Sequence, residues 1–155
     1  MRGYYDILEK LRVTLEANPS VNTVTEGDLL DVDLAKQTIF PLSHIVIQNA
    51  TFQEHTITFN MNILFMDLVD FNKDEPKADI PFRGNNNEQD VLNTMLQAAN
   101  KLWSDLSRGD LYTDKYQISG TPTAEPFVER FDNELAGWDL TLSISIPNSD
   151  ISVCS

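Results

Sequence analysis

The residues of this chain that could do chemistry are two histidines and several carboxylates. His44 and His55 fall on two segments that the pattern predicts to be neighbouring strands, and Glu54 stands next to His55. Imidazole and carboxylate groups hold zinc when a fold brings three or four of them together. A metal site therefore requires all three side chains to converge. The alternative, which we favour, is that they are polar residues near strand ends.

A second acidic group closes a long predicted strand. Asp67 and Asp70 are followed by Asp74 and Glu75. Such a group could hold a divalent cation or supply a pair of carboxylates for acid–base chemistry. In a chain this acidic, a solvated acidic strand end is the expectation that we favour.

Other candidates lack part of what their chemistry needs. Asp31 and Asp33 resemble the opening of a calcium loop, but no glycine and no terminal glutamate follow at the required spacing. Ser43 is adjacent to His44, whereas a nucleophile needs its base placed by the fold and oriented by a third group. Cys154 is the single cysteine and stands next to the last residue. The sequence contains no nucleophile elbow, dinucleotide fingerprint or P-loop motif. We therefore expect no enzyme, no cofactor and no bound metal.

Apolar residues at spacings of three and four predict two helices. The first covers residues 4–17 and ends at Asn18-Pro19, since proline cannot continue a helix. The second runs from the N-cap Asn87 to Arg108-Gly109. Their apolar stripes are Tyr4, Leu8, Leu11 and Leu15, then Val91, Met95, Ala98, Leu102 and Leu106, with Leu92, Ala99 and Trp103 expected to widen the second.

Alternating or β-branched residues predict the strands. Residues 21–24 and 28–33 are short extended pieces, a strand begins at Phe40-Pro41, and 48–53 is expected to connect it to the next strand. That strand, 56–70, has one polar face in its first half and two apolar faces in its second half. Further strands are expected at 116–119, 124–130 and 138–146, the last with Trp138 in the core. Pro41 and Pro126 indicate sheet edges.

This order of elements predicts a single domain, residues 1–155, of the α+β class. We expect an antiparallel or mixed β-sheet with two main helices packed on one face. Residues 71–87 form a long predicted loop of mixed charge, and loops of this length often serve binding. The interface candidates within it are Asp74, Glu75, Lys77, Phe82, Arg83, Asn85 and Asn86.

Composition excludes several classes of function. The chain has 155 residues, with 24 acidic and 11 basic side chains and a formal net charge of −13. That balance argues against binding DNA or RNA through phosphate contacts, which need clustered Lys and Arg. No apolar run is long enough to span a membrane, and the N-terminus has no apolar signal core, so we expect neither a membrane partner nor secretion.

Several stretches resemble the small tail-terminator and tail-completion proteins of tailed bacteriophages. They are 4–8, 37–42, 84–93, 109–112 and 135–140. The resemblance implies a structural virion protein without cofactor, located at the head-proximal end of the tail and assembled in the host cytoplasm. It implies a ring, usually a hexamer, that stops polymerisation of the tail tube, meets the tube protein and the head–tail connector, and lets DNA pass through its lumen.

Three other interpretations remain open. The resemblance also admits another neck or connector protein. The residues admit an acidic adaptor outside any virus that binds a basic partner as a monomer or dimer. They also admit a small hydrolase, which would need a cleft where His44, His55 and carboxylates converge.

Overall fold

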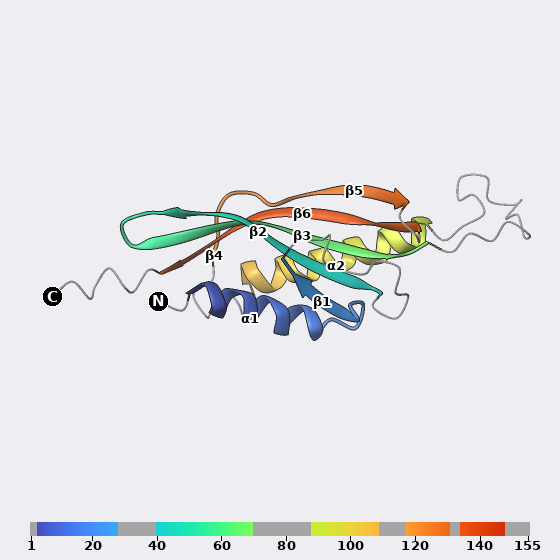
Figure 1. Ribbon diagram of the computed structural model, residues 1–155, viewed down its shortest axis with the longest axis horizontal. Coiled ribbons are helices and arrows are strands. Elements are labelled where there is room, and N and C mark those ends of the chain that lie inside the picture. The colour runs from blue at the N-terminus through green and yellow to red at the C-terminus, as the bar shows by residue number, and fades with distance from the viewer. Residues whose placement is uncertain (1–2, 28–39, 70–87, 109–116, 131–133, 148–155) are drawn as a thin grey trace, which may run out of the picture.

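Two helices lie on one face of a six-stranded mixed sheet (Figure 1). A computed structural model describes residues 3–27, 40–69, 88–108, 117–130 and 134–147. The helices are α1 (Gly3–Glu16) and α2 (Glu88–Arg108). The strands are β1 (Thr23–Glu26), β2 (Leu42–Phe52), β3 (Thr56–Leu68), β4 (Gln117–Ile118), β5 (Thr123–Arg130) and β6 (Glu134–Pro147). The predicted α+β class, with a mixed sheet and both helices on one face, is confirmed.

The strands follow the order β1-β2-β3-β6, and the outer side of β6 is shared by β4 and β5. β1 runs parallel to β2, whereas every other pair is antiparallel. The prediction that Pro126 marks an edge is confirmed, because β5 pairs with β6 alone among the described strands. The same prediction for Pro41 is wrong. Pro41 directly precedes β2, which lies between β1 and β3, and a proline ahead of the first ladder residue removes no ladder bond.

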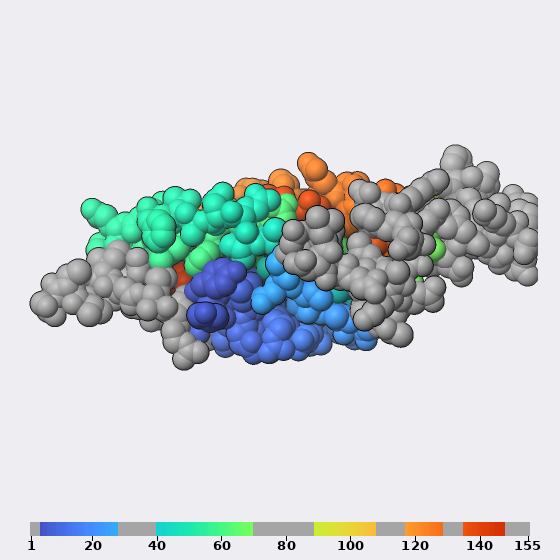
Figure 2. Space-filling model, in the orientation of Figure 1, coloured from blue at the N-terminus to red at the C-terminus, as the bar shows by residue number. Residues whose placement is uncertain are grey.

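The hairpin of β2 and β3 is longer than the sequence predicts. We expected 48–53 to be a connection, but β2 continues to Phe52 and only residues 53–55 join the strands. A one-residue bulge at Gln48 shifts the register between Ile47 and Asn49. The prediction failed because the end of β2 has polar residues where a half-buried strand would alternate. The hairpin runs past the N-terminal end of α1 (Figures 1 and 2).

The main core lies between the sheet and the helices. Every residue of the predicted α2 stripe is buried, as are Leu8, Leu11 and Leu15 of α1. Ile7 is buried too and was not predicted. The sheet contributes alternate residues of its central strands, namely Ile57, Phe59, Met61, Ile63 and Phe65 of β3 with Leu140, Leu142, Ile144 and Ile146 of β6. Alternation places these side chains on the helix-facing side of the sheet.

A smaller apolar cluster lies on the opposite, open face. Its buried members are Phe40, Leu42, Met66 and Leu135. Leu64 and Leu68 of β3 and Phe127 of β5 pack against it. The prediction that the second half of β3 is apolar on both faces is therefore confirmed.

The two tryptophans differ in their surroundings. Trp103 is 37% exposed, so the prediction that it belongs to the core is wrong; the apolar stripe of α2 is narrower than the sequence suggested. Trp138 is partly buried against the core, and its Nε1–H donates to the carbonyl oxygen of Leu92 at 2.8 Å. The predicted caps Asn87 and Gly109, and the extended piece 28–33, lie outside the described residues.

Candidate functional site

The interface residues predicted from the long loop lie outside the described residues. They are Asp74, Glu75, Lys77, Phe82, Arg83, Asn85 and Asn86. The same holds for Asp31, Asp33, Asp70 and Cys154.

The two histidines do not converge. His44 is fully buried near the start of β2, whereas His55 is exposed in the turn that follows the same strand. At about 3.3 Å per residue, the length of β2 between them separates them by roughly 25 Å or more. His44 Nδ1 lies 2.6 Å from Thr25 Oγ1, and His44 Nε2 lies 2.8 Å from the carbonyl oxygen of Gly27. No group of three metal-binding side chains occurs within the described residues.

Asp67 is half-buried at the end of β3. Burial raises the pKa of its carboxyl group, and the hydrogen bond that it accepts from the Leu68 backbone N–H opposes this rise. Its predicted neighbours Asp70, Asp74 and Glu75 lie outside the described residues, so the acidic pair stays a prediction.

The feature best suited to binding is the open side of β2. β1 pairs only with Leu42–Ile45, and it ends at Glu26. Gly27 follows with a φ of 95°, a conformation that glycine adopts without a steric penalty and that diverts the chain from the strand. None of the described strands pairs with the remaining stretch of β2, Val46–Phe52, on this side.

The register identifies which backbone groups face the open side. The Ile45 carbonyl accepts a hydrogen bond from the Gly27 N–H, so the backbone N–H and C=O of Ile45 point toward β1. Because the backbone groups of successive strand residues point to opposite edges, those of Ile47 point to the same side as those of Ile45. At the other end the Gln53 N–H donates to the Thr56 carbonyl oxygen, so the backbone groups of Gln53 point toward β3. By the same alternation, the backbone groups of Phe52 and Ala50 point away from β3, to the open side. The open stretch therefore presents N–H and C=O groups at Ile47, Ala50 and Phe52.

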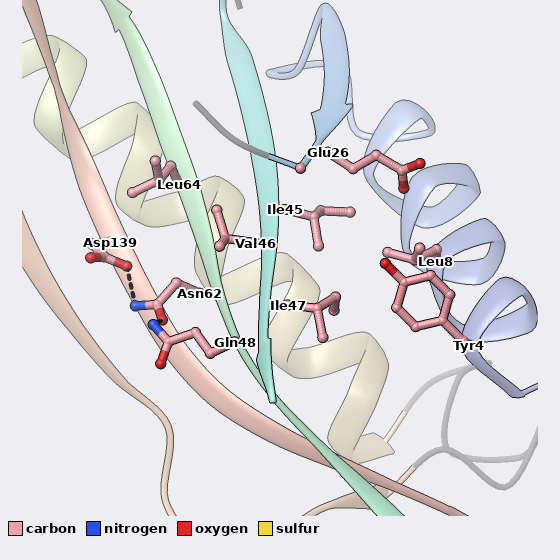
Figure 3. A pocket seen from close by; sticks show the side chains of 11 residues that line it. Tyr4, Leu8, Glu26, Ile45, Val46, Ile47, Gln48, Asn62, Leu64 and Asp139 are labelled. Atoms are coloured by element: carbon pink, nitrogen blue, oxygen red, sulfur yellow. Dashed lines mark hydrogen bonds between the residues drawn. The ribbon is translucent and has the colours of Figure 1, made fainter. Parts of the chain in front are cut away.

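A groove of about 590 Å³ lies at the start of this stretch, where Ile45–Gln48 of β2 line it (Figure 3). Its apolar wall lies between α1 and the sheet, where Tyr4 and Leu8 face Ile45 and Ile47. Glu26, the last residue of β1, stands at one end. On the other face of the sheet the groove is lined by Val46, Gln48, Asn62, Leu64 and Asp139. The site thus offers backbone hydrogen bonds beside an apolar wall, which are the parts needed to bind an extended peptide.

The charges of the groove are negative. Two carboxylates, Glu26 and Asp139, line it, and none of the described residues that line it is a Lys, Arg or His. Asp139 Oδ1 accepts a hydrogen bond of 2.8 Å from Asn62 Nδ2, which fixes its orientation. Gln48 in turn donates to Asn62 Oδ1. The groove therefore favours a ligand with positive charge.

Amide and hydroxyl side chains cover much of the open face of the sheet. Asn60 donates to Asn49 and accepts from Ser143, and Thr58 Oγ1 lies 2.7 Å from Ser145 Oγ. The register places all of them on the face opposite the helices. Among the side chains that the structure describes, this face has no Lys or Arg, and its charged members are Asp139 and Glu125.

Sequence reasoning found parts of the groove without assembling them. Tyr4 and Leu8 belong to the predicted helix stripe, and Glu26 and Gly27 fall between the two predicted extended pieces, 21–24 and 28–33. The stretch that forms the open edge was assigned to a hairpin connection. The turn at Gly27 was the available signal that β1 is shorter than β2.

Comparison with known proteins adds no relative: no family model and no curated protein matches the chain. Within the described residues, no helix is both long and apolar enough to cross a membrane.

Proposed function

We propose that this protein is a structural subunit of a tailed bacteriophage, a tail terminator that forms a ring on the head-proximal end of the tail tube. The observation that carries the proposal is the open face of the sheet, where the described polar side chains beside the small apolar cluster are mainly amides, hydroxyls and two carboxylates, without a Lys or Arg. If this face lines the lumen of a ring, DNA can pass, because phosphates are held chiefly by Lys and Arg.

Two further observations support the proposal. The resemblance to tail-terminator and tail-completion proteins implies a small α+β domain, and the chain has that class of fold. Its net charge of −13 suits a subunit that must not retain nucleic acid. Its partners would be further copies of itself, the tube protein and the head–tail connector.

The first test is the mass and shape of the purified chain. We expect light scattering after size exclusion to give about six times the subunit mass of 17.5 kDa, and negative stain to show a central hole. A compact dimer without a hole at every concentration would favour an acidic adaptor. A monomer would require the same measurement with tail tubes added, and failure to form a ring on them would contradict the proposal.

The proposed role of the open face has its own test. Thr141 is exposed on that face, and Thr141→Lys places a cation beside Asn62 and Asp139. We expect the wild-type assembly to leave duplex DNA unretarded in a gel at low salt, and a ring of the variant to retard it. Lys101→Gln on α2, away from this face, is the control and should bind no DNA. Retardation of DNA by the wild-type ring would contradict the proposal.

The predicted loop contacts remain part of the proposal. Deletion of 74–82 should weaken ring formation or docking to the tube while the domain stays folded. Unchanged assembly of the deletion variant would remove the loop from the interface.

A further inference from the structure

Within the part of the chain that the structure describes, the open stretch of β2 has few of the features that protect sheet edges. Natural edge strands are guarded by charged side chains, proline, bulges or covering elements, because an unguarded edge pairs with other chains. Val46–Phe52 contains no charged residue and no proline in a chain of net charge −13. Among the described features of this stretch, the bulge at Gln48 is the one that protects an edge. The edge at β5, by contrast, has the exposed Glu125 and Pro126.

Apolar surface accompanies the unpaired backbone. Phe52 is 74% exposed, and it shares the helix-facing side with Ala50 and Ile47 by the pairing of β2 with β3. Tyr4, half exposed at the start of α1, stacks edge-on against Phe59, the partner of Ala50. Exposed aromatic rings beside unpaired backbone are typical of protein-binding surfaces.

From these observations we infer that the groove beside β2 binds an extended, basic segment of another protein as an added strand. The segment's backbone pairs with Ile47, Ala50 and Phe52. Its alternate apolar side chains lie against Tyr4, Leu8 and Ile47. Its Lys or Arg side chains meet Glu26 at the end of β1 and Asp139 on the open face.

The charges select the kind of partner. An added strand from a second copy could come from β5, a long described strand at the opposite edge of the sheet. That strand carries Glu125, which would approach Glu26 and Asp139 and repel them, and Pro126 lacks a backbone donor. A basic segment gains the opposite interaction, and the acidic chain also speeds its encounter. This inference stands apart from the tail assignment, because it concerns a groove within one chain.

The test uses random dodecapeptides displayed on a carrier and selected against the purified chain. We expect apolar residues at every second position of the selected peptides, and Lys or Arg among the others. The apolar side chains of such a strand would lie against Tyr4 and Leu8. The best peptide is then synthesised with a fluorophore and its affinity is measured by anisotropy.

Two pairs of variants separate the parts of the site. Ala50→Pro removes an outward N–H, and Ala50→Val keeps it. Glu26→Lys and Glu125→Lys change the net charge equally, but only the first lies in the groove. We expect Ala50→Pro and Glu26→Lys each to weaken binding about tenfold or more, and the two controls to bind within about twofold of wild type. If Ala50→Pro does not fold, the comparison of Glu26→Lys with Glu125→Lys tests the inference by itself.

Hydrogen exchange gives an independent readout. The amides of Ile47, Ala50 and Phe52 should gain protection when the peptide binds. Recovery of no binder, acidic or helical binders, or equal loss of affinity in Glu26→Lys and Glu125→Lys would overturn the inference. Protection of the same amides in the chain alone, rising with its concentration, would assign the groove to a second copy and would also overturn it.

Discussion

His44 Nε2 lies 2.8 Å from the carbonyl oxygen of Gly27, and this contact joins the interior of β2 to the turn that ends β1. A carbonyl oxygen only accepts, so Nε2 carries a hydrogen and donates it. The other ring nitrogen lies 2.6 Å from Thr25 Oγ1, the side chain opposite His44 in the parallel ladder. The buried ring therefore holds the last residues of β1 and the turn in place, and so fixes where the open stretch of β2 begins.

Replacing the ring should loosen this turn. His44→Ala removes both hydrogen bonds and leaves a cavity, so we expect it to lower the free energy of unfolding by about 2–3 kcal/mol in urea. His55→Ala, in the exposed turn at the far end of β2, is the control and should change it by less than about 0.5 kcal/mol. Equal values for the two variants would contradict the structural role of His44.

Gly137 of β6 pairs with Met66 of β3 and leaves no room for a side chain against the backbone of that strand. A Cβ atom built at this position would stand 1.8 Å from the carbonyl oxygen of Phe65, a rigid backbone atom. Gly137→Ala must therefore push the two strands apart, and we expect a loss of about 3 kcal/mol in the free energy of unfolding. Val128→Ala on the exposed part of β5 should cost about 0.5 kcal/mol. A melting temperature of Gly137→Ala equal to that of the wild type would refute this packing.

Ser43 and Ser145 allow a buried hydroxyl without a partner to be compared with a partly buried one that has a partner. Ser43 is fully buried in β2, and its Oγ has no hydrogen-bond partner within the described part of the chain, whereas Ser145 Oγ lies 2.7 Å from Thr58 Oγ1. Removing an unsatisfied hydroxyl relieves a desolvation cost, so Ser43→Ala should raise the free energy of unfolding by about 1 kcal/mol. Ser145→Ala should lower it by a similar amount. Destabilisation by Ser43→Ala would show that its hydroxyl is satisfied.

Asp67 should make stability depend on pH. Burial raises the pKa of its carboxyl group in the folded chain, so the ionised form is less favourable there than in the unfolded chain. This cost is absent below the unfolded pKa, appears as the pH rises toward the folded pKa and is fully present above it.

Asp67→Asn keeps an acceptor for the Leu68 N–H and removes the charge. It should therefore raise the free energy of unfolding at pH 7 and leave it nearly unchanged near pH 3. Asp105→Asn is the control, since Asp105 pairs with Lys101 at 3.0 Å on α2 and gains nothing from neutralisation. A stabilisation by Asp67→Asn that is equal at both pH values would contradict burial as the cause.

Periodicity was enough to predict the elements that bury one face. The stripe of α2 and the alternation of β3 and β6 reflect contacts with a single core, and such contacts impose a regular spacing on the residues. Trp103 shows the limit of that signal. An apolar residue at the border of a helix stripe can lie either in the core or at the surface. In the structure Trp103 is partly exposed.

The candidate site was beyond sequence reasoning for a different reason. It arises where β1 stops and β2 continues, a difference in length between two strands that depends on their register. The exposed end of β2 has no periodic apolar signal, because Gln48–Thr51 contact other polar groups or solvent. The loop that we had selected instead lies outside the described residues, so its role remains a prediction.

The position of β6 has a consequence for how the chain reaches its native state. β6 pairs with β3 along its whole length and with β4 and β5 on its other side, yet it is the last described strand to leave the ribosome. Before β6 is available, the backbone groups on one side of β3 have no strand to pair with. The helices also lack the apolar residues of β6 on which they pack. Contacts this distant in sequence are slow to form, and the waiting strands are prone to aggregate. Synthesis and release of β6, rather than of any earlier strand, should therefore be the event that commits this domain to folding.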